Sequence, residues 1–259
     1  MFFYKYHGTG NDFILFDNRD GKIKLSAEQV AKLCHRRFGI GADGLMLLEQ
    51  AAGYDFRMVY YNADGGESTM CGNGGRCLTA FAQKLGIIEH KAGFIAIDGP
   101  HTAEILGNGL ISLHMKDVAG MAMHDGYTIL NTGSPHYVAW VKSVKDVDVF
   151  AEGRSIRSQQ HFQPHGINVN FVQIMDNRLS VRTYERGVED ETLSCGTGVT
   201  AAAIAATCNA TGSFQTHIET PGGNLKVSFT KPSELVARNV ILTGPAVFVY
   251  KGEIDIQTP

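Results

Sequence analysis

The sequence of 259 residues lacks several features that mark particular classes of protein. Its 23 lysines and arginines stand against 26 aspartates and glutamates, and no basic run is present. Neither nucleic acid nor an anionic membrane surface is therefore indicated as a partner. No Cys-x-x-Cys pair occurs, so the usual zinc spacing is missing and no metal is expected.

Long apolar runs are also missing. The longest stretch of small apolar residues, Val199–Cys208, contains two threonines and is far shorter than the roughly 20 residues that span a bilayer. Lys5 and His7 interrupt the start of the chain, and no apolar segment of a signal peptide follows. We expect a soluble cytoplasmic protein with reduced thiols.

Glycine and cysteine are the informative residue types. The 30 glycines make up about 12% of the chain, against a usual level of roughly 7%. The five cysteines are an odd number, which fits neither a disulfide scaffold nor a zinc module. The remaining composition is that of a globular protein, and the length indicates one or two domains.

Short β-branched and aromatic runs predict a chain made mostly of strands, with few helices. Ser26-Ala-Glu-Gln29 fits a capping box that opens a helix ending near Arg36. The ranges 73–85 and 197–211 are rich in alanine, lack internal proline and predict two more helices. The fold class predicted from this pattern is α+β. The strands are expected at residues 12–17, 56–61, 94–98, 110–114, 137–141, 167–174, 179–184, 225–230 and 240–242.

An internal repeat relates the two halves of the chain. Met70-Cys-Gly-Asn-Gly74 opens one predicted helix, and Ser194-Cys-Gly-Thr-Gly198 opens the other. A run of β-branched and aromatic residues and an acidic loop precede each copy. A strand ending in an acidic residue follows each copy. Two related domains are therefore expected, with a boundary near residues 118–127.

Each repeated cysteine lies where a loop becomes a helix. The unpaired N–H groups and partial positive charge of a helix N-terminus favour a thiolate, and Gly-x-Gly allows close approach of a carboxylate. Two such thiols could invert a stereocentre, because one could remove the α-proton while the other returns a proton to the opposite face. The pair Cys71 and Cys195 therefore suggests this chemistry, and a buried structural role is expected for Cys34, Cys77 and Cys208.

One alternative comes from another class of enzyme. Gly196-Thr-Gly198-Val-Thr-Ala201 fits the dinucleotide fingerprint Gly-x-Gly-x-x-Ala, and Glu219 follows near the expected acidic position. The preceding stretch 188–192 is acidic and polar rather than a buried strand. An NAD-binding oxidoreductase therefore stays a remote alternative.

Motifs along almost the whole chain resemble those of the diaminopimelate epimerase family. Two positions depart from the common pattern, since Ser134 replaces an asparagine and Gly44 replaces a glutamine found in some members. The matching segments are His7-Gly-Thr-Gly-Asn-Asp-Phe13, Gly39-Ile-Gly-Ala-Asp-Gly-Leu45, Tyr61-Asn-Ala-Asp-Gly65, Met70-Cys-Gly-Asn-Gly-Gly-Arg76, Gly133-Ser-Pro-His136, Gly166-Ile-Asn168, Tyr184-Glu-Arg-Gly187, Ser194-Cys-Gly-Thr-Gly198 and Gly244-Pro-Ala246.

The resemblance implies two pseudo-symmetric domains, each a β-barrel-like sheet around a central helix. Residues 1–118 with 248–259 would form the half that carries Cys71, and residues 119–247 the half that carries Cys195. The active site would lie in the cleft between them. The resemblance also implies a homodimer that needs no cofactor.

The resemblance further implies a set of site residues. Cys71 and Cys195 would be the catalytic acid and base, and His136 and Glu185 would tune their protonation. The remaining residues would hold the substrate: Asn11, Asn62, Gly72, Asn73, Ser134, Asn168, Glu185, Arg186, Gly196 and Thr197.

The implied activity is the epimerisation of LL-diaminopimelate to meso-diaminopimelate, for lysine and peptidoglycan synthesis. A proline or hydroxyproline racemase with the same pair of thiols is the closer alternative, because spacing alone does not rank the groups that bind the distal end of the substrate.

Overall fold

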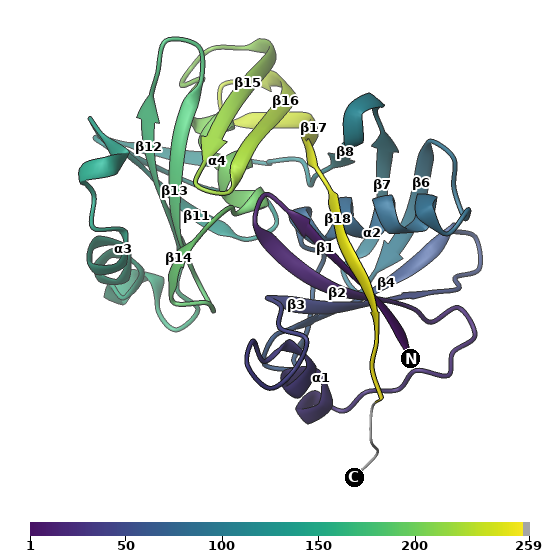
Figure 1. Ribbon diagram of the computed structural model, residues 1–259. Helices are drawn as coiled ribbons and strands as arrows, with labels where there is room; N and C mark the ends of the chain where they lie inside the picture. The colour runs from purple at the N-terminus through teal and green to yellow at the C-terminus, as the bar shows by residue number, and fades with distance from the viewer. Residues whose placement is uncertain (256–259) are drawn as a thin grey trace. The chain divides into compact units, whose positions relative to one another are not determined.

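The computed structural model describes residues 1–255, which form two compact units (Figure 1). Of the described residues, the first unit contains 1–113 and 245–255, and the second contains 114–244. Residues 256–259 of the expected returning segment, 248–259, lie outside the described residues. Within the described part of the chain, no helix has both the length and the apolar character needed to cross a membrane.

The first unit is a curved sheet around one long helix, α2 (Gly72–Lys84). A shorter helix, α1 (Ala27–Cys34), lies between the second and third strands along the chain. The strands are β1 (Phe2–Gly8), β2 (Asn11–Asp17), β3 (Gly44–Glu49), β4 (Phe56–Asn62), β5 (Glu67–Ser68), β6 (Lys91–Ala96), β7 (Gly99–Ile105), β8 (Leu110–His114) and β18 (Val247–Glu253).

The sheet of the first unit contains both parallel and antiparallel strand pairs. The order of paired strands is β18-β1-β2-β3-β4-β6-β7-β8. The pairs β2–β3 and β4–β6 are parallel, and the others in this order are antiparallel. A helix bridges each parallel pair, since α1 connects β2 to β3 and α2 lies between β4 and β6 in the chain.

The second unit has the same plan around α4 (Gly196–Ala205), with α3 (Val149–Arg157) as its shorter helix. Its strands pair in the order β9-β10-β11-β12-β13-β15-β16-β17, with β11–β12 and β13–β15 parallel. The strands are β9 (Met121–His124), β10 (Tyr127–Asn131), β11 (Pro135–Trp140), β12 (Asn168–Ile174), β13 (Leu179–Glu185), β14 (Asp190–Thr192), β15 (Gly212–Thr220), β16 (Gly223–Ser233) and β17 (Val236–Pro245).

The two pairing orders match strand for strand. The pairs β1–β2 and β10–β11 correspond, as do β3–β4 and β12–β13, and in each unit the long helix comes after a short strand, β5 or β14. The predicted fold, α+β with two pseudo-symmetric halves and a central helix in each, is confirmed.

The two central helices are buried over most of their length. Most residues of α2 are buried and the buried positions of α4 include its alanines, because strands surround each helix. Small residues at the N-terminal turn make this packing possible. A Cβ at Gly74 would collide with the Met46 side chain, and one at Gly198 would collide with Asn170.

Several elements depart from the sequence prediction. β3 was not predicted, because Leu-Met-Leu-Leu has no β-branched residue and no alternation, as is usual for a strand buried on both faces. α3 was also missed, since Gly153 and Ser155 weaken its helical pattern. α4 ends at Ala205 rather than near 211. Cys208 is therefore exposed, at a positive φ of 46°, and its predicted burial inside the helix was wrong.

The predicted capping box at the start of α1 is confirmed. The Ser26 hydroxyl accepts a hydrogen bond from Gln29 N at 3.2 Å, and Gln29 Oε1 accepts one from Ser26 N at 2.8 Å. We expect Ser26→Ala to lower the free energy of unfolding by about 1 kcal/mol, because one helix N–H loses its partner. Urea unfolding followed by circular dichroism measures the change. Ser233→Ala, at an exposed position, is the control and should change stability by less than about 0.5 kcal/mol.

Candidate active site

Cys71 lies at the first turn of the central helix of its unit. It is the N-cap residue of α2, with extended backbone angles, and its carbonyl accepts the first helical bond from Gly75 N at 2.7 Å. The sulfur makes no capping bond to the helix. The half-buried thiol therefore lies at the end of the helix where first-turn N–H groups are found, as the Cys-Gly-x-Gly motif predicted.

Two asparagines next to Cys71 have amide orientations that charged neighbours fix. Arg76 Nη2 donates to Asn73 Oδ1 at 2.9 Å, so Asn73 Nδ2 is directed to Asn11 Oδ1, 3.2 Å away. Asn11 Nδ2 in turn donates to the Asp43 carboxylate at 2.8 Å. Because Asp43 accepts from the Asn11 NH2 group, the atom of Asn11 that faces the Cys71 thiol, at 3.8 Å, is the acceptor Oδ1.

An ion-pair cluster supports Asn11 from the opposite side. Arg36 bridges Asp12 and Asp43 at 2.8 and 2.6 Å, and Lys5 pairs with Asp12 at 2.8 Å. Burial alone would raise the pKa of Asp12, but its hydrogen bonds with Arg36 and Lys5 hold that pKa at about 2. Asp12 therefore stays ionised at neutral pH, and the cluster that it forms with Arg36 and Asp43 keeps the Asn11 amide in its orientation.

Cys195 occupies the same place in the second unit. It is the N-cap residue of α4, its carbonyl accepts from Val199 N at 2.9 Å, and its sulfur makes no capping bond. The sulfur lies 3.5 Å from the Thr197 hydroxyl, which lies 3.3 Å from the Ser134 hydroxyl. Thr132 fixes the backbone here by donating to Thr197 O at 2.9 Å.

His136 is fully buried behind these hydroxyls, and its partners determine its tautomer. Asn170 Nδ2 lies 3.1 Å from Nδ1 of His136 and also donates to Tyr137 O, while Thr183 donates to Asn170 Oδ1. The amide group must therefore donate to Nδ1, which leaves the proton of the ring on Nε2. That Nε2–H points to the Ser134 hydroxyl at 3.0 Å.

A series of hydrogen bonds leads from His136 through two hydroxyl groups toward the sulfur of Cys195. Ser134 Oγ accepts from His136 and from Asn168 Nδ2, at 3.2 Å, so its own proton is available to Thr197. Thr197 is then free to donate to the sulfur of Cys195. His136 thus reaches this thiol through two hydroxyls.

Other residues implied by the resemblance occupy the ends of β12, β13 and β4. Asn168 Oδ1 accepts from Arg186 N at 2.9 Å, and the Arg186 guanidinium donates to His165 O. The Glu185 carboxylate accepts from Thr192 at 2.9 Å. Asn62 lies at the end of β4, and its N–H closes a turn with Gly66 O.

The structure joins most of these residues into two networks, one in each unit. Asn11 and Asn73 lie next to Cys71, and Ser134, His136, Asn168 and Thr197 lead to Cys195. In the described part of the chain, no hydrogen bond connects the Asn62 side chain to Asn11 or Cys71. Sequence reasoning gave no role to Asp43, Arg76, Thr132 or Asn170, although Asn170 is separated from Asn168 by one residue and so shares its face of β12.

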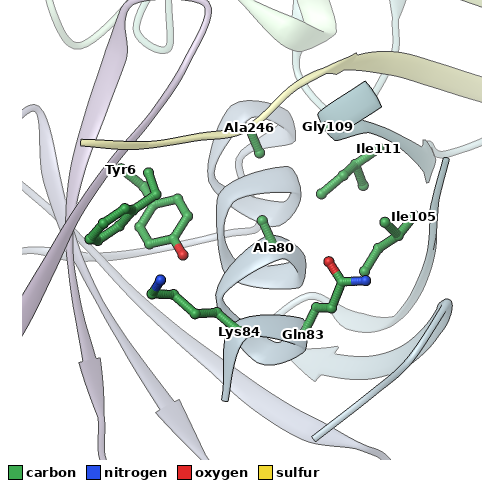
Figure 2. Close-up of a pocket in the computed structure, with 9 residues that line it drawn as sticks. Tyr6, Ala80, Gln83, Lys84, Ile105, Gly109, Ile111 and Ala246 are labelled. Carbon is green, nitrogen blue, oxygen red and sulfur yellow. The ribbon is translucent and has the colours of Figure 1, made fainter. Parts of the chain in front are cut away.

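A pocket of about 440 Å³ in the first unit lies at the other end of α2 (Figure 2). Its walls include Ala80, Gln83 and Lys84 of α2, whose ammonium lies 4.3 Å from the centre of the Phe248 ring. The pocket contains none of the predicted site residues. Cys71 precedes Gln83 by more than three helical turns, so the pocket is separate from the thiol.

Comparison with known proteins identifies the family. The model of the family described as diaminopimelate epimerase matches residues 3–116 and 128–249. The chain belongs to the diaminopimelate epimerase family. Among similar curated proteins, the diaminopimelate epimerase of Flavobacterium psychrophilum is 54% identical, over 98% of this chain and 100% of the relative. That of Chlorobaculum tepidum is 44% identical, over 96% and 99%.

Solved structures with the same fold include more distant proteins. A phenazine biosynthesis protein of the PhzF family from Bacillus anthracis gives a TM-score of 0.75 at 16% identity, covering 99% of each chain. A hydroxyproline epimerase from Agrobacterium vitis gives 0.67 at 14% identity, covering 97% of this chain and 91% of the other. The resemblance to diaminopimelate epimerases and the isomerase class are thus confirmed, and these distant neighbours support the fold alone.

Buried His136 should make this epimerase family member sensitive to acid. Burial, assisted by the charge of Arg186, lowers the pKa of His136 to about 3, whereas an unfolded histidine has a pKa of about 6.5. Between these values the unfolded chain binds a proton that the folded chain does not, so stability falls as pH falls below 6.5. Acidification from pH 6.5 to 5 should remove about 2 kcal/mol through this group.

Urea unfolding at pH 7 and pH 5 tests this expectation. The wild-type protein should lose more stability between the two pH values than His136→Asn does, whatever the stability of the variant at pH 7. Equal losses in the two proteins would show that His136 does not carry the effect.

Proposed function

We propose that this protein interconverts LL- and meso-diaminopimelate by proton exchange at one α-carbon. The observation that carries the proposal is the presence of a cysteine at the N-cap of the central helix in both units, each followed by Gly-x-Gly. Membership of the diaminopimelate epimerase family supports this substrate over proline or hydroxyproline.

The proposed reaction uses the two sulfur atoms as a base and an acid. One cysteine, as the thiolate, takes the proton from the α-carbon and becomes a thiol. The other, as the thiol, gives its proton to the opposite face of the resulting carbanion and becomes the thiolate. The proton count is balanced, and the enzyme ends with the two protonation states exchanged. Both Cys71 and Cys195 must reach the same α-carbon for this to occur.

The helix ends supply the electrostatic part of the proposal. Backbone N–H groups at Gly72, Asn73, Gly196 and Thr197 would bind the substrate carboxylate and stabilise the charge that develops next to it. Neither sulfur uses these groups for capping, which supports the assignment.

The remaining substrate contacts are assigned from the family motifs. His136 would tune the thiol of Cys195 through Ser134 and Thr197, and Glu185 would share this role. The distal amino-acid end and the rest of the substrate would be held by Asn11, Asn62, Ser134, Asn168, Glu185 and Arg186.

The setting of the enzyme is part of the same proposal. The reaction would need no pyridoxal phosphate or other cofactor and would serve lysine and peptidoglycan synthesis. Residues 1–118 with 248–259 and residues 119–247 would act as two catalytic halves. None of the five cysteines forms a disulfide, which supports a reducing, cytoplasmic location.

A homodimer is also proposed, on the apolar surface of β18. Val247, Phe248, Val249 and Tyr250 are each between 39% and 50% exposed, and they follow one another in the strand. Phe248 also forms part of the wall of the pocket in Figure 2. A second copy of the chain would cover these side chains, because large apolar residues exposed on both faces of a strand are unfavourable in water.

Incubation of LL-diaminopimelate in D2O without added cofactor tests the activity. Deuterium should enter one α-carbon as the meso form appears, measured by mass spectrometry and chiral chromatography. Cys71→Ser and Cys195→Ser should each reduce epimerisation by roughly 10²–10⁴-fold, because a hydroxyl is a poor substitute for an acid–base thiol.

Cys208→Ser is the matched control, since Cys208 is exposed and outside the proposed site, and it should leave the rate unchanged. Racemisation of proline, or consumption of a nicotinamide cofactor, with no labelled product from diaminopimelate would contradict the proposal. A full rate in either Cys71→Ser or Cys195→Ser would contradict the two-thiol mechanism.

Light scattering after size-exclusion chromatography tests the dimer. The wild-type protein should have twice the chain mass, and Val249→Lys should shift it to the monomer, because a charge would be buried at the interface. Ile174→Lys, at a position 66% exposed in β12, is the control and should stay dimeric. A monomeric wild-type protein would rule out the dimer.

A further inference from the structure

Arg76 is a completely buried arginine whose partners are all neutral. Its Nη1 donates to Gly72 O at 3.1 Å, its Nη2 to Asn73 Oδ1 at 2.9 Å, and its Nε to Pro245 O at 3.3 Å. Arginine stays protonated in proteins, so a full positive charge lies inside the first turn of α2.

The described residues supply no carboxylate as an ion-pair partner for Arg76, although an uncompensated buried charge is strongly unfavourable. The ionisable groups that interact with its charge are the thiols of Cys77 and Cys71. Burial raises the pKa of Cys77 to about 12, so Cys77 stays protonated at neutral pH. Cys71 is then the protein group next to Arg76 that can become negative.

The second unit has no such charge at the equivalent position. The offset that relates Cys71 to Cys195 places Thr200 opposite Arg76 in the repeat. The Thr200 hydroxyl donates to Gly196 O at 2.8 Å, just as Arg76 donates to Gly72 O. The two side chains therefore satisfy equivalent carbonyl groups, but one is cationic and the other is neutral.

We propose that the buried guanidinium of Arg76 stabilises negative charge at the N-terminal end of α2, so that Cys71 loses its proton more readily than Cys195. Arg76 is a positioning residue in this proposal, because it acts on the thiol and on Asn73 rather than on the substrate. The proposal rests on the proposed function, in which both thiols exchange protons with the substrate.

The other charges around α2 are mostly compensated. On the strands packed against this helix, Lys5 pairs with Asp12, and Glu49 accepts a hydrogen bond from Asn18. His101 lies 3.1 Å from Asp98. The other ionisable side chains on these strands are Tyr4, Tyr6, His7, Asp17, Arg57, Tyr60, Tyr61 and Glu104.

Around α4, the hydrogen bonds from Cys195 through Thr197 and Ser134 lead to His136, which is neutral above a pKa of about 3. Arg182 pairs with Glu191 at 2.6 Å, and Lys231 donates to Thr207 beyond the far end of α4. The other ionisable side chains on the strands packed against α4 are Tyr127, Tyr137, Tyr184, Glu185, His217, Glu219 and Lys226.

Two sulfur contacts act against the proposal, and both are weaker than the charge. Asn11 Oδ1, as an acceptor 3.8 Å from Cys71, favours the thiol there. The Thr197 hydroxyl, 3.5 Å from Cys195, can donate to a thiolate. Both are contacts to neutral dipoles at long range, whereas a full charge in buried surroundings is little screened.

Peptide-resolved alkylation tests the proposal. The reduced, substrate-free, full-length enzyme is treated briefly with iodoacetamide from pH 5 to pH 10, and alkylation of Cys71 and Cys195 is quantified by mass spectrometry. The pH midpoint for Cys71 should lie below that for Cys195 by at least about one pH unit, the lower limit for a neighbouring opposite charge. Equal midpoints, or a lower midpoint for Cys195, would overturn the proposal.

Three variants separate charge from packing. Arg76→Met should raise the midpoint of Cys71, Arg76→Lys should keep it low, and Thr200→Val, the matched change in the other unit, should leave it unchanged. If Arg76→Met does not fold, as judged by circular dichroism, Arg76→Gln replaces it. An unchanged midpoint in a folded variant that lacks the charge would also overturn the proposal.

The alkylation measurement is independent of catalysis. If diaminopimelate is not epimerised but the midpoints differ as expected, the proposed function fails and the role of Arg76 stands. If diaminopimelate is epimerised but the midpoints are equal, the role of Arg76 fails and the proposed function stands.

Discussion

The close packing of a glycine-led helix inside a curved sheet is the constraint on which each unit depends. A Cβ at Gly198 would collide with Asn170 Oδ1, which Thr183 holds by a hydrogen bond, and a Cβ at Gly74 would displace the flexible end of the Met46 side chain. Because the helix is held this deeply, its first-turn N–H groups and its N-cap cysteine keep fixed positions. The chemistry of the thiols is thus set by backbone packing as much as by the side chains beside them.

The repeated topology carries different side chains at equivalent places. The network at Cys71 is built on asparagine amides between Arg76 and Asp43, whereas the network at Cys195 is built on hydroxyls that lead back to neutral His136. An amide network between ions resists reorientation, while hydroxyl protons can rotate. The two halves are therefore equal in fold and unequal in electrostatics.

The pattern of short strands predicted the fold class, the repeated motif and the alanine-rich ranges predicted the central helices, and motifs along almost the whole chain predicted the family. These patterns were not enough for β3, whose leucines and methionine lack a strand pattern, or for Cys208, which lies beyond an early helix end at Ala205. The hydrogen-bond partners of the site residues could not be predicted from the sequence either. Asn170 contacts His136 through strand pairing, and Asp43 contacts Asn11 through loop packing, rather than through neighbouring positions in the chain. Residue spacing predicts an element and its ends, but it does not say which distant amide will face a histidine.

The pairing of β18 with β1 has a consequence for how the protein folds during synthesis. The second unit is continuous, from 114 to 244, while the first lacks one strand of its sheet until β18 has left the ribosome. The Met1 ammonium donates to Ile254 O at 2.6 Å, next to the pairing of β1 with β18. Domains usually fold in the order in which they are made. Here the second unit can be complete first, and the first unit is completed only when β18 has been made.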